Sequence, residues 1–285
     1  MSNDKTILVT GATGQQGGAV ARELLKNGYK VKAMTRNPDN PKAKELADLG
    51  AEVVRGDFDD AASLEIELVG VWGAFAVQNS WEGGVEKEEE QGKRFAEISK
   101  KVNLQHLVYT SVGSAHRDTG IPHFDNKWRI EEKIRSLDLP SYTIIRPVFF
   151  MDNFLSPWFK PSIDQGQLAV GMNPNSSLQM IAVEDIGKHG LRAFKNYKEL
   201  NGKAIDIAGD ELTMTDAAKI ISDKKGSAVE FSQVPIEEVR SFSDDYALML
   251  EWFDDVGYNV NISSLAEESV ISPIKFSAWA NNISW

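Results

Sequence analysis

The chain opens with a short apolar run that leads into a glycine-rich segment. Residues 6–10 read TILVT, and residues 11–18 read GATGQQGG. The β-branched run predicts a strand, and the apolar residues at helical spacing that follow predict a helix ending before Asn27. A second strand is predicted over residues 30–35. This order of strand, glycine turn, helix and strand is typical of a parallel α/β sheet that binds a nucleotide.

Three glycines of the segment have separate geometric roles. Gly11 lets the chain leave the strand in a tight turn, Gly14 lets the backbone approach a phosphate, and Gly17 lets the helix lie close to the sheet. The backbone N–H groups expected to point at the anion, helped by the helix dipole, belong to Thr13, Gln15 and Gln16. We therefore predict a dinucleotide pyrophosphate site. The alternative is a glycine turn with only a structural role.

The residues after the second strand favour NADP over NAD. An NAD-binding chain places a carboxylate there to hold the ribose hydroxyls. This chain has TRNP at positions 35–38 and no carboxylate before Asp39. The guanidinium of Arg36 matches a 2′-phosphate in charge and in fork geometry. The competing interpretation is an ordinary solvated surface arginine.

Composition narrows the functional class further. The chain has no cysteine, which excludes disulfides, zinc–thiolate sites and a redox-active thiol. The formal net charge of −11 argues against nonspecific binding to nucleic acid or to an anionic membrane. There is no long apolar segment and no leader-like start, so we expect a cytoplasmic protein that does not span a membrane. No metal site is predicted. The acidic run at residues 86–90 is interpreted as the solvated start of a helix.

The rest of the pattern predicts one doubly wound parallel sheet, an extended Rossmann fold, with a small mixed α/β lobe at its C-terminal end. We expect a Rossmann domain over residues 1–155 and an interleaved smaller lobe over residues 156–285. An irregular loop is predicted over residues 157–175. Further strands are predicted at residues 52–55, 71–77, 106–110, 142–146 and 205–207, and further helices at 42–49, near 64, 85–102, 126–137, 183–187 and 217–221.

Several motifs resemble the NmrA-like family of atypical short-chain dehydrogenase/reductases, and most closely its NADPH-sensor branch. They are TGATGQQGG at residues 10–18, RNP at 36–38, GD at 56–57, QNSW at 78–81, HFDNK at 123–127 and FMDN at 150–153. The resemblance covers about residues 5–255 and is strongest before residue 160. Where the sensor branch has a lysine near the cofactor, this chain has Glu90.

The resemblance implies a set of NADP(H) contacts. Asp57 and Phe58 would flank the adenine, and Lys127 would close on the nicotinamide end. The residues near the nicotinamide ribose would be Gln78, Asn79 and Ser80. The other residues expected at the nicotinamide end are Phe150, Met151, Asp152 and Asn153.

The catalytic pair of related reductases is incomplete here. Those enzymes place Tyr-x-x-x-Lys on one helix face, and the tyrosine supplies the proton when hydride arrives. This chain has His123 and Lys127 at that spacing, so the usual acid is missing. One hypothesis is a nucleotide-redox sensor without efficient turnover. The alternative is an NADPH-dependent oxidoreductase of a quinone, an enone or a small carbonyl compound that uses Lys127 or His123.

Other residues leave the class of partner open. Ser111 and Ser114 lie where such folds place a carbonyl-binding hydroxyl, although serines are also ordinary loop residues there. Aromatic residues could line an apolar pocket, although core packing is the expected role for most of them; they are Trp81, Phe149, Phe150, Trp158, Trp252 and Phe253. Trp279 and Trp285 are expected to anchor the last segment on the domain or on a second subunit. A protein partner or a homodimer is therefore a third hypothesis beside the substrate.

Overall fold

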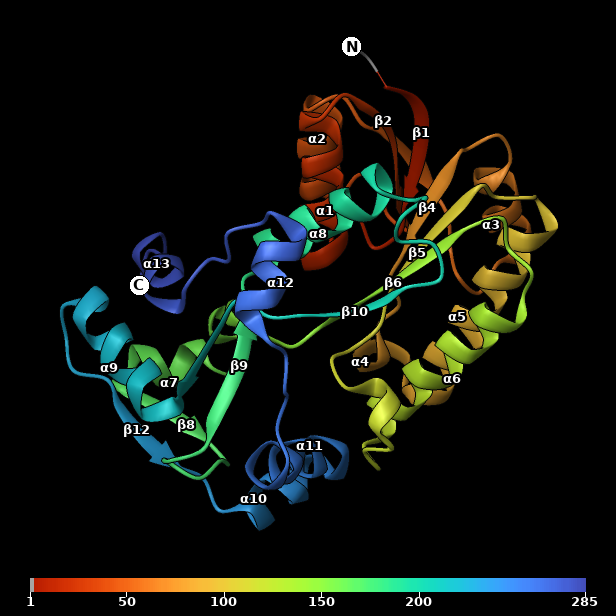
Figure 1. Cartoon of the computed structure of the whole chain (residues 1–285). Coiled ribbons are helices and arrows are strands. Elements are labelled where there is room, and N and C mark those ends of the chain that lie inside the picture. Colours follow the sequence, from red (N-terminus) through yellow and green to blue (C-terminus); the bar gives the residue numbers. More distant parts are fainter. Residues whose placement is uncertain (1–2) are drawn as a thin grey trace. The chain divides into compact units, whose positions relative to one another are not determined.

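The computed structural model describes residues 3–285 and divides into two units (Figure 1). The first unit comprises the residues up to His116 together with 123–146 and 186–205, and the second comprises 117–122, 147–185 and 206–285. The chain thus passes from one unit to the other several times. The division into domains at residue 155 stays a prediction.

The first unit is built on a seven-stranded sheet with the strand order β10-β6-β5-β4-β1-β2-β3. Neighbouring strands from β1 to β6 pair in parallel. The strands are β1 (Asn3–Val9), β2 (Tyr29–Thr35), β3 (Glu52–Arg55), β4 (Gly73–Ala76), β5 (His106–Thr110), β6 (Tyr142–Pro147) and β10 (Ala204–Ile207). The chain order reverses between β1 and β4, so the predicted doubly wound sheet is confirmed. Sheets of this kind bind ligands beyond the carboxyl ends of the strands at such a reversal.

Helices cover both faces of this sheet (Figure 1). The face with α1 and α8 also carries α2, and the opposite face carries α3, α5 and α6. The helices are α1 (Gln15–Lys26), α2 (Pro41–Asp48), α3 (Ala61–Leu68), α4 (Ser80–Gly83), α5 (Val85–Lys101), α6 (Pro122–Ser136) and α8 (Val183–Lys195). On the second face, Phe95 of α5 and Ile130 of α6 pack against Leu8, Ala74 and Leu107 of the strands. Burial of these side chains fixes the helices, and so the loops that leave the strands.

Helices α1 and α8 approach each other closely through two glycines. A Cβ atom on Gly187 would lie 2.9 Å from the carbonyl oxygen of Ala19, and one on Gly190 would lie 2.6 Å from a methyl group of Val20. A larger side chain at either position would push α8 away from α1. Because α1 carries the glycine-rich segment at its start, this contact holds that segment in place.

The second unit contains two small sheets and short helices. One sheet has the order β11-β9-β7, with β9 antiparallel to β11, and the other pairs β8 with β12 in parallel. The strands are β7 (Phe149–Phe150), β8 (Gln167–Val170), β9 (Ser177–Ile181), β11 (Asp210–Thr213) and β12 (Glu230–Gln233). The helices are α7 (Lys160–Asp164), α9 (Met214–Lys225), α10 (Ile236–Phe242), α11 (Asp244–Asp255), α12 (Ile262–Ser269) and α13 (Phe276–Asn281). The prediction of an irregular loop over residues 157–175 is wrong in part, because α7 and β8 lie within it.

An aromatic cluster forms the core of the second unit. The ring of Phe154 lies 5.5 Å from that of Phe276 and 6.3 Å from that of Trp279, measured between centroids. Trp279 is buried, and the indole N–H of Trp285 donates to the carbonyl of Ala280. The two tryptophans therefore anchor the last segment on its own unit, one of the two outcomes that the sequence predicts.

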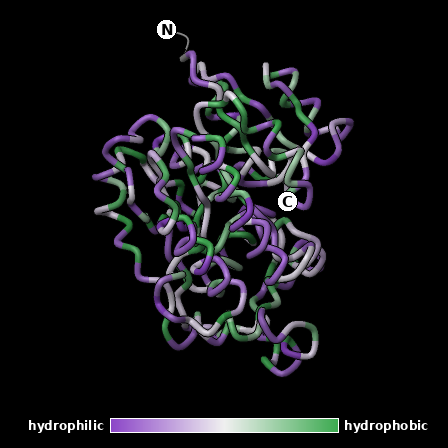
Figure 2. The backbone as a smooth tube through the Cα atoms, turned by 90° about the vertical axis from the view of Figure 1, so that its right-hand side faces the viewer, coloured by the Kyte–Doolittle hydropathy of each residue, from purple (hydrophilic) through white to green (hydrophobic). Residues whose placement is uncertain are grey.

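Hydrophobic and hydrophilic residues alternate at short intervals along the backbone (Figure 2). Among residues 3–285 no helix is both long and apolar enough to cross a membrane.

Candidate functional site

The glycine-rich segment forms the turn between β1 and α1. Gly11 has a φ of +54°, a conformation that a side chain disfavours, and its carbonyl accepts from the N–H of Gly14 at 2.8 Å. A Cβ atom on Gly17 would lie 2.3 Å from the carbonyl oxygen of Gly11 and 2.5 Å from that of Thr10. The predicted close approach of helix and strand therefore depends on glycine at position 17.

The start of α1 is suited to an anion. Gly14 is the residue before the helix and supplies no side-chain cap, and the first turn carries no acidic residue. Gly11, Gly14 and Gln15 are exposed. The first N–H groups of a helix have no partner within the helix, and they lie at the positive end of its dipole. These features are those of an anion-binding helix start, and the pyrophosphate contacts of Thr13 and Gln15 stay a prediction.

A hydrogen bond of Gln16 links the glycine turn to the carboxyl end of β5. Its side-chain oxygen accepts from the hydroxyl of Thr110, at the end of β5, at 2.7 Å. The hydroxyl of Thr10 donates to the carbonyl of Val77 and accepts from its N–H at 2.9 Å. The carboxyl ends of β1, β4 and β5 are thus tied together around the turn.

Two buried polar side chains at this edge have no hydrogen-bond partner among the described residues. They are the amide of Gln78, 8% exposed, and the hydroxyl of Ser111, 3% exposed. Ala76 of β4 pairs with Tyr109 of β5. Gln78 and Ser111 each come two residues after this pair, so they leave neighbouring strands at the same level. An unpaired buried polar group costs about 1–3 kcal/mol, which a polar ligand can offset. These two groups fit a ribose or a carboxamide at this edge.

Arg36 follows β2, at the position predicted for a 2′-phosphate contact. One of its guanidinium nitrogens donates to Glu82 of α4 at 2.6 Å, and the two side chains are 65% and 55% exposed. The side chain of Asn79, predicted to lie near the ribose, caps α4 by accepting from the N–H of Trp81 at 3.1 Å. Ser80 is the first residue of that helix. The structure therefore gives Asn79 a role in α4 itself.

Asp57 and Phe58, the predicted adenine neighbours, lie directly beyond β3. The ring of Phe58 packs edge-on against Phe95, with centroids 5.7 Å apart, at the margin of the core. A carboxylate oxygen of Asp57 accepts from the N–H of Asp59 at 3.0 Å. Hydrogen bonds from Gln91 and Lys87 hold the pKa of Asp59 below its ordinary value. These contacts fix the loop beyond β3 against α5.

Helix α6 brings His123 and Lys127 to one face. The sequence predicts this helix from residue 126, but it begins at Pro122, so His123 lies in its first turn. His123 is buried, with ring centroids 5.4 Å from Trp81 and 4.8 Å from Phe124. Lys127 donates to Glu88, a carboxylate that is 1% exposed. Both residues are therefore embedded in packed surroundings.

Glu88, the buried partner of Lys127, is the residue of this candidate site that the sequence interpretation does not identify. It belongs to the acidic run at residues 86–90, which was expected to be solvated, yet it is buried and also accepts from the amide of Asn126 at 2.9 Å. The helical spacing indicates the burial of Glu88, because positions 85, 88, 92 and 95 lie on one face of the helix. Glu90, the departure from the sensor branch, is exposed.

The remaining predicted contacts, Phe150 to Asn153, lie in the second unit. Phe150 ends β7, and the next three residues open a 3-10 helix over Met151–Leu155. Met151 is fully buried. A carboxylate oxygen of Asp152 accepts from the N–H of Val183 at 2.9 Å, and burial raises the pKa of this carboxyl. Their predicted contact with a cofactor stays a prediction.

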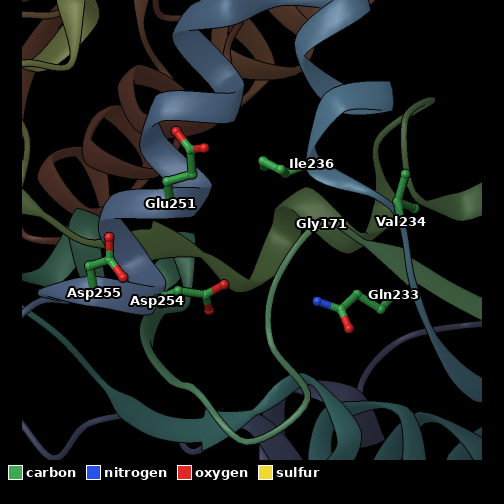
Figure 3. A pocket seen from close by; sticks show the side chains of 7 residues that line it. All are labelled: Gly171, Gln233, Val234, Ile236, Glu251, Asp254 and Asp255. Atoms are coloured by element: carbon green, nitrogen blue, oxygen red, sulfur yellow. The ribbon is translucent and has the colours of Figure 1, made fainter.

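The second unit also contains a pocket of about 220 Å³ (Figure 3). It is lined by Gly171, Gln233, Val234, Ile236, Glu251, Asp254 and Asp255. The carboxylates give it an acidic wall that repels phosphate, so it is no candidate for a dinucleotide. Within residues 3–285 no cluster of three or more His, Cys, Asp or Glu side chains could hold a metal ion.

Comparisons with known proteins find relatives over most of the chain. The sequence model of the NmrA-like family matches residues 3–280. An NmrA-like family domain-containing protein of Dictyostelium discoideum is 32% identical over 89% of this chain and 88% of its own length. The NmrA-like family domain-containing oxidoreductase notA' of Aspergillus versicolor is 44% identical over 73% of this chain and 66% of its own length.

A solved structure with the same fold is NmrA, described as a negative transcriptional regulator, in complex with NADP. It superimposes with a TM-score of 0.81 over 98% of this chain and 95% of that chain, at 20% identity. At this identity the likeness establishes the fold.

Proposed function

Because the chain belongs to the NmrA-like family, we propose that it binds NADP(H) at the carboxyl edge of its large sheet and works as a nucleotide-redox sensor. The observation that carries the proposal is the start of α1, which has an open glycine turn, no side-chain cap and no acidic first turn. NmrA, which has the same fold, is described in complex with NADP, and this supports NADP(H) as the ligand. Arg36 would hold the 2′-phosphate, and the turn from Gly11 to Gly17 would hold the pyrophosphate.

The contacts of Lys127 favour a sensor over an efficient reductase. Bound NADPH supplies a hydride, so a reductase also needs a group that delivers a proton to the acceptor. The position of the usual tyrosine holds His123, which packs against two aromatic rings. Lys127 already donates to the buried Glu88. These contacts suit a lysine that positions a ribose, and they leave the proton donor unassigned.

The second candidate function is an NADPH-dependent oxidoreductase. The relative notA' is named an oxidoreductase. The unpaired hydroxyl of Ser111 could donate to a substrate carbonyl beside the nicotinamide, with Lys127 or His123 as the acid. A quinone, an enone or a small aldehyde remains the proposed substrate class.

The first experiment is a binding titration of the purified chain with NADPH, NADP⁺, NADH and NAD⁺. We expect the phosphorylated pair to bind at least about tenfold more tightly, and Arg36→Ala to remove most of that preference. Binding of none of the four nucleotides would contradict the proposed function. Equal affinity for NADPH and NADH in both proteins would contradict the assignment of Arg36.

The second experiment separates the two candidates. A sensor should bind NADPH and NADP⁺ with different affinities, or change its sedimentation or partner binding between them, while a panel of quinones, enones and aldehydes leaves NADPH unoxidised. A reductase should oxidise NADPH with one acceptor of the panel, and Lys127→Ala should abolish the oxidation. Turnover that depends on Lys127 would overturn the sensor assignment.

A further inference from the structure

The ion pair between Arg36 and Glu82 joins the segments that follow the two strands on either side of β1. In the sheet, β1 lies between β2 and β4. Arg36 follows β2, whereas Glu82 lies on α4, the first helix after β4. Their side chains meet at 2.6 Å. The pair therefore reaches from one side of β1 to the other at its carboxyl end, where the glycine turn begins.

The short helix α4 determines the position of Glu82 relative to Arg36. Helix α4 is a single turn, held at its start by Asn79 and followed by Gly84 with a φ of +87°. The lysine on the next helical turn, Lys87, is bound to Asp59 at 2.6 Å. Glu82 thus faces the guanidinium of Arg36, the group that the proposed function assigns to the 2′-phosphate.

Two anions would then compete for one guanidinium. A planar guanidinium can hold a phosphate through two parallel hydrogen bonds, whereas Glu82 uses one nitrogen. Exposed ion pairs contribute little, about 0–1 kcal/mol, so a phosphate of higher charge can displace the carboxylate. NAD(H) carries a 2′-hydroxyl in place of the phosphate and brings no anion to Arg36.

We propose that Glu82 determines nucleotide specificity by competing with the 2′-phosphate of NADP(H) for Arg36, so that NADP(H) releases α4 and NAD(H) leaves it tied. The inference rests on the proposed NADP(H) site and adds a residue that opposes binding. In this arrangement the ion pair occupies Arg36 until the 2′-phosphate of a phosphorylated nucleotide replaces Glu82, and a nucleotide without that phosphate binds beside the intact pair. Helix α4 carries Trp81, which contacts His123, so its release alters the surroundings of α6.

The test is a titration of the full chain and its Glu82→Gln variant with NADPH and NADH. We expect the variant to bind NADPH about two- to fivefold more tightly, the range of an exposed ion pair. Its affinity for NADH should stay unchanged. The matched control is Glu86→Gln, which removes one exposed carboxylate four residues further along and should leave both affinities unchanged.

The same substitution in the Arg36→Ala background separates competition from simple repulsion. With no guanidinium to compete for, Glu82→Gln should no longer tighten NADPH binding. An equal gain in both backgrounds, an equal gain from Glu86→Gln, or no gain at all in a chain that binds NADPH would overturn the inference and leave the proposed function standing. If the unmodified chain binds no nucleotide, the proposed function itself fails and this inference fails with it.

Discussion

At the scale of single residues, the candidate site depends on glycines, whose lack of a side chain allows close backbone packing. Gly17 has no Cβ, and this lets the first turn of α1 lie against the carbonyls of Thr10 and Gly11. This close contact between α1 and the end of β1 fixes the direction of the helix N-terminus relative to the glycine turn. A helix moved outward by a side chain would keep its dipole but lose its alignment with the turn.

Gly17→Ala should therefore lower both stability and nucleotide affinity. Its Cβ would meet two backbone oxygens at 2.3 and 2.5 Å, and overpacking of this kind costs about 1–3 kcal/mol. Urea denaturation and NADPH titration measure the two effects. The control is Gly18→Ala, where the added atom lies 3.1 Å from the oxygen of Ala12 and 3.2 Å from the flexible end of Arg22, so we expect little change. Equal losses from both substitutions would contradict this role of Gly17.

The sequence predicted the tight turn at Gly11 and the close approach at Gly17 because these backbone roles follow from local spacing, whereas the role of Arg36 stays a prediction. It did not predict the partners of Arg36 or Lys127. Glu82 and Glu88 lie 46 and 39 residues from these two cations. Their contacts arise from the order of strands in the sheet, which local spacing does not determine.

At the scale of elements, a buried ion pair joins α6 to β6. Glu131 has no exposed surface and accepts from Arg146 through both its oxygens, at 2.8 and 2.6 Å. Arg135, which is partly exposed, donates to the same carboxylate at 2.7 Å. The pair fixes the helix that carries His123 and Lys127 relative to the sheet.

Glu131→Gln should be strongly destabilising, because it leaves the charge of Arg146 buried without its counter-ion. Breaking a buried pair in this way costs about 3–5 kcal/mol. The double substitution Glu131→Met with Arg146→Met should cost less than Glu131→Gln alone, since no buried charge is left. Arg135→Gln is the control and should cost under about 1 kcal/mol. Denaturant unfolding measures all three, and a double variant less stable than the single one would contradict the argument.

Elements were predicted best where the signal is local. The strands at residues 52–55 and 106–110 have the predicted bounds. Helix α6, which the sequence predicts from residue 126, begins at Pro122, a residue suited to a first helical position. Strand β8 was missed because it pairs with β12, more than 60 residues later, and a short strand of this kind has little local pattern.

At the scale of the whole molecule, two buried histidines set the response to acid. Burial lowers the pKa of both His106 and His189 to about 4, from an ordinary value of 6.5. Their folded-state pKa lies below the unfolded value. The stability they contribute is therefore complete above pH 6.5 and is lost as the pH falls from 6.5 toward 4.

Each histidine should remove about 2 kcal/mol from the free energy of unfolding between pH 7 and pH 5. Urea denaturation at these two values measures the loss. The variant with His106→Gln and His189→Gln should start less stable at pH 7, because His106 bonds Ser141 at 2.9 Å, but should show a smaller difference between the two pH values. An unchanged difference would mean that other groups cause the acid response.

The division of the chain between its two units limits how recombination can exchange them. The backbone changes unit at residues 116/117, 122/123, 146/147, 185/186 and 205/206, which makes five crossings. Helix α8, which packs on α1, and β10, which completes the large sheet, come after residues 147–185 of the second unit in the chain. Recombination at a single point therefore cannot exchange one unit and leave the other whole. Exchange of the whole second unit would need recombination at each of the five crossings.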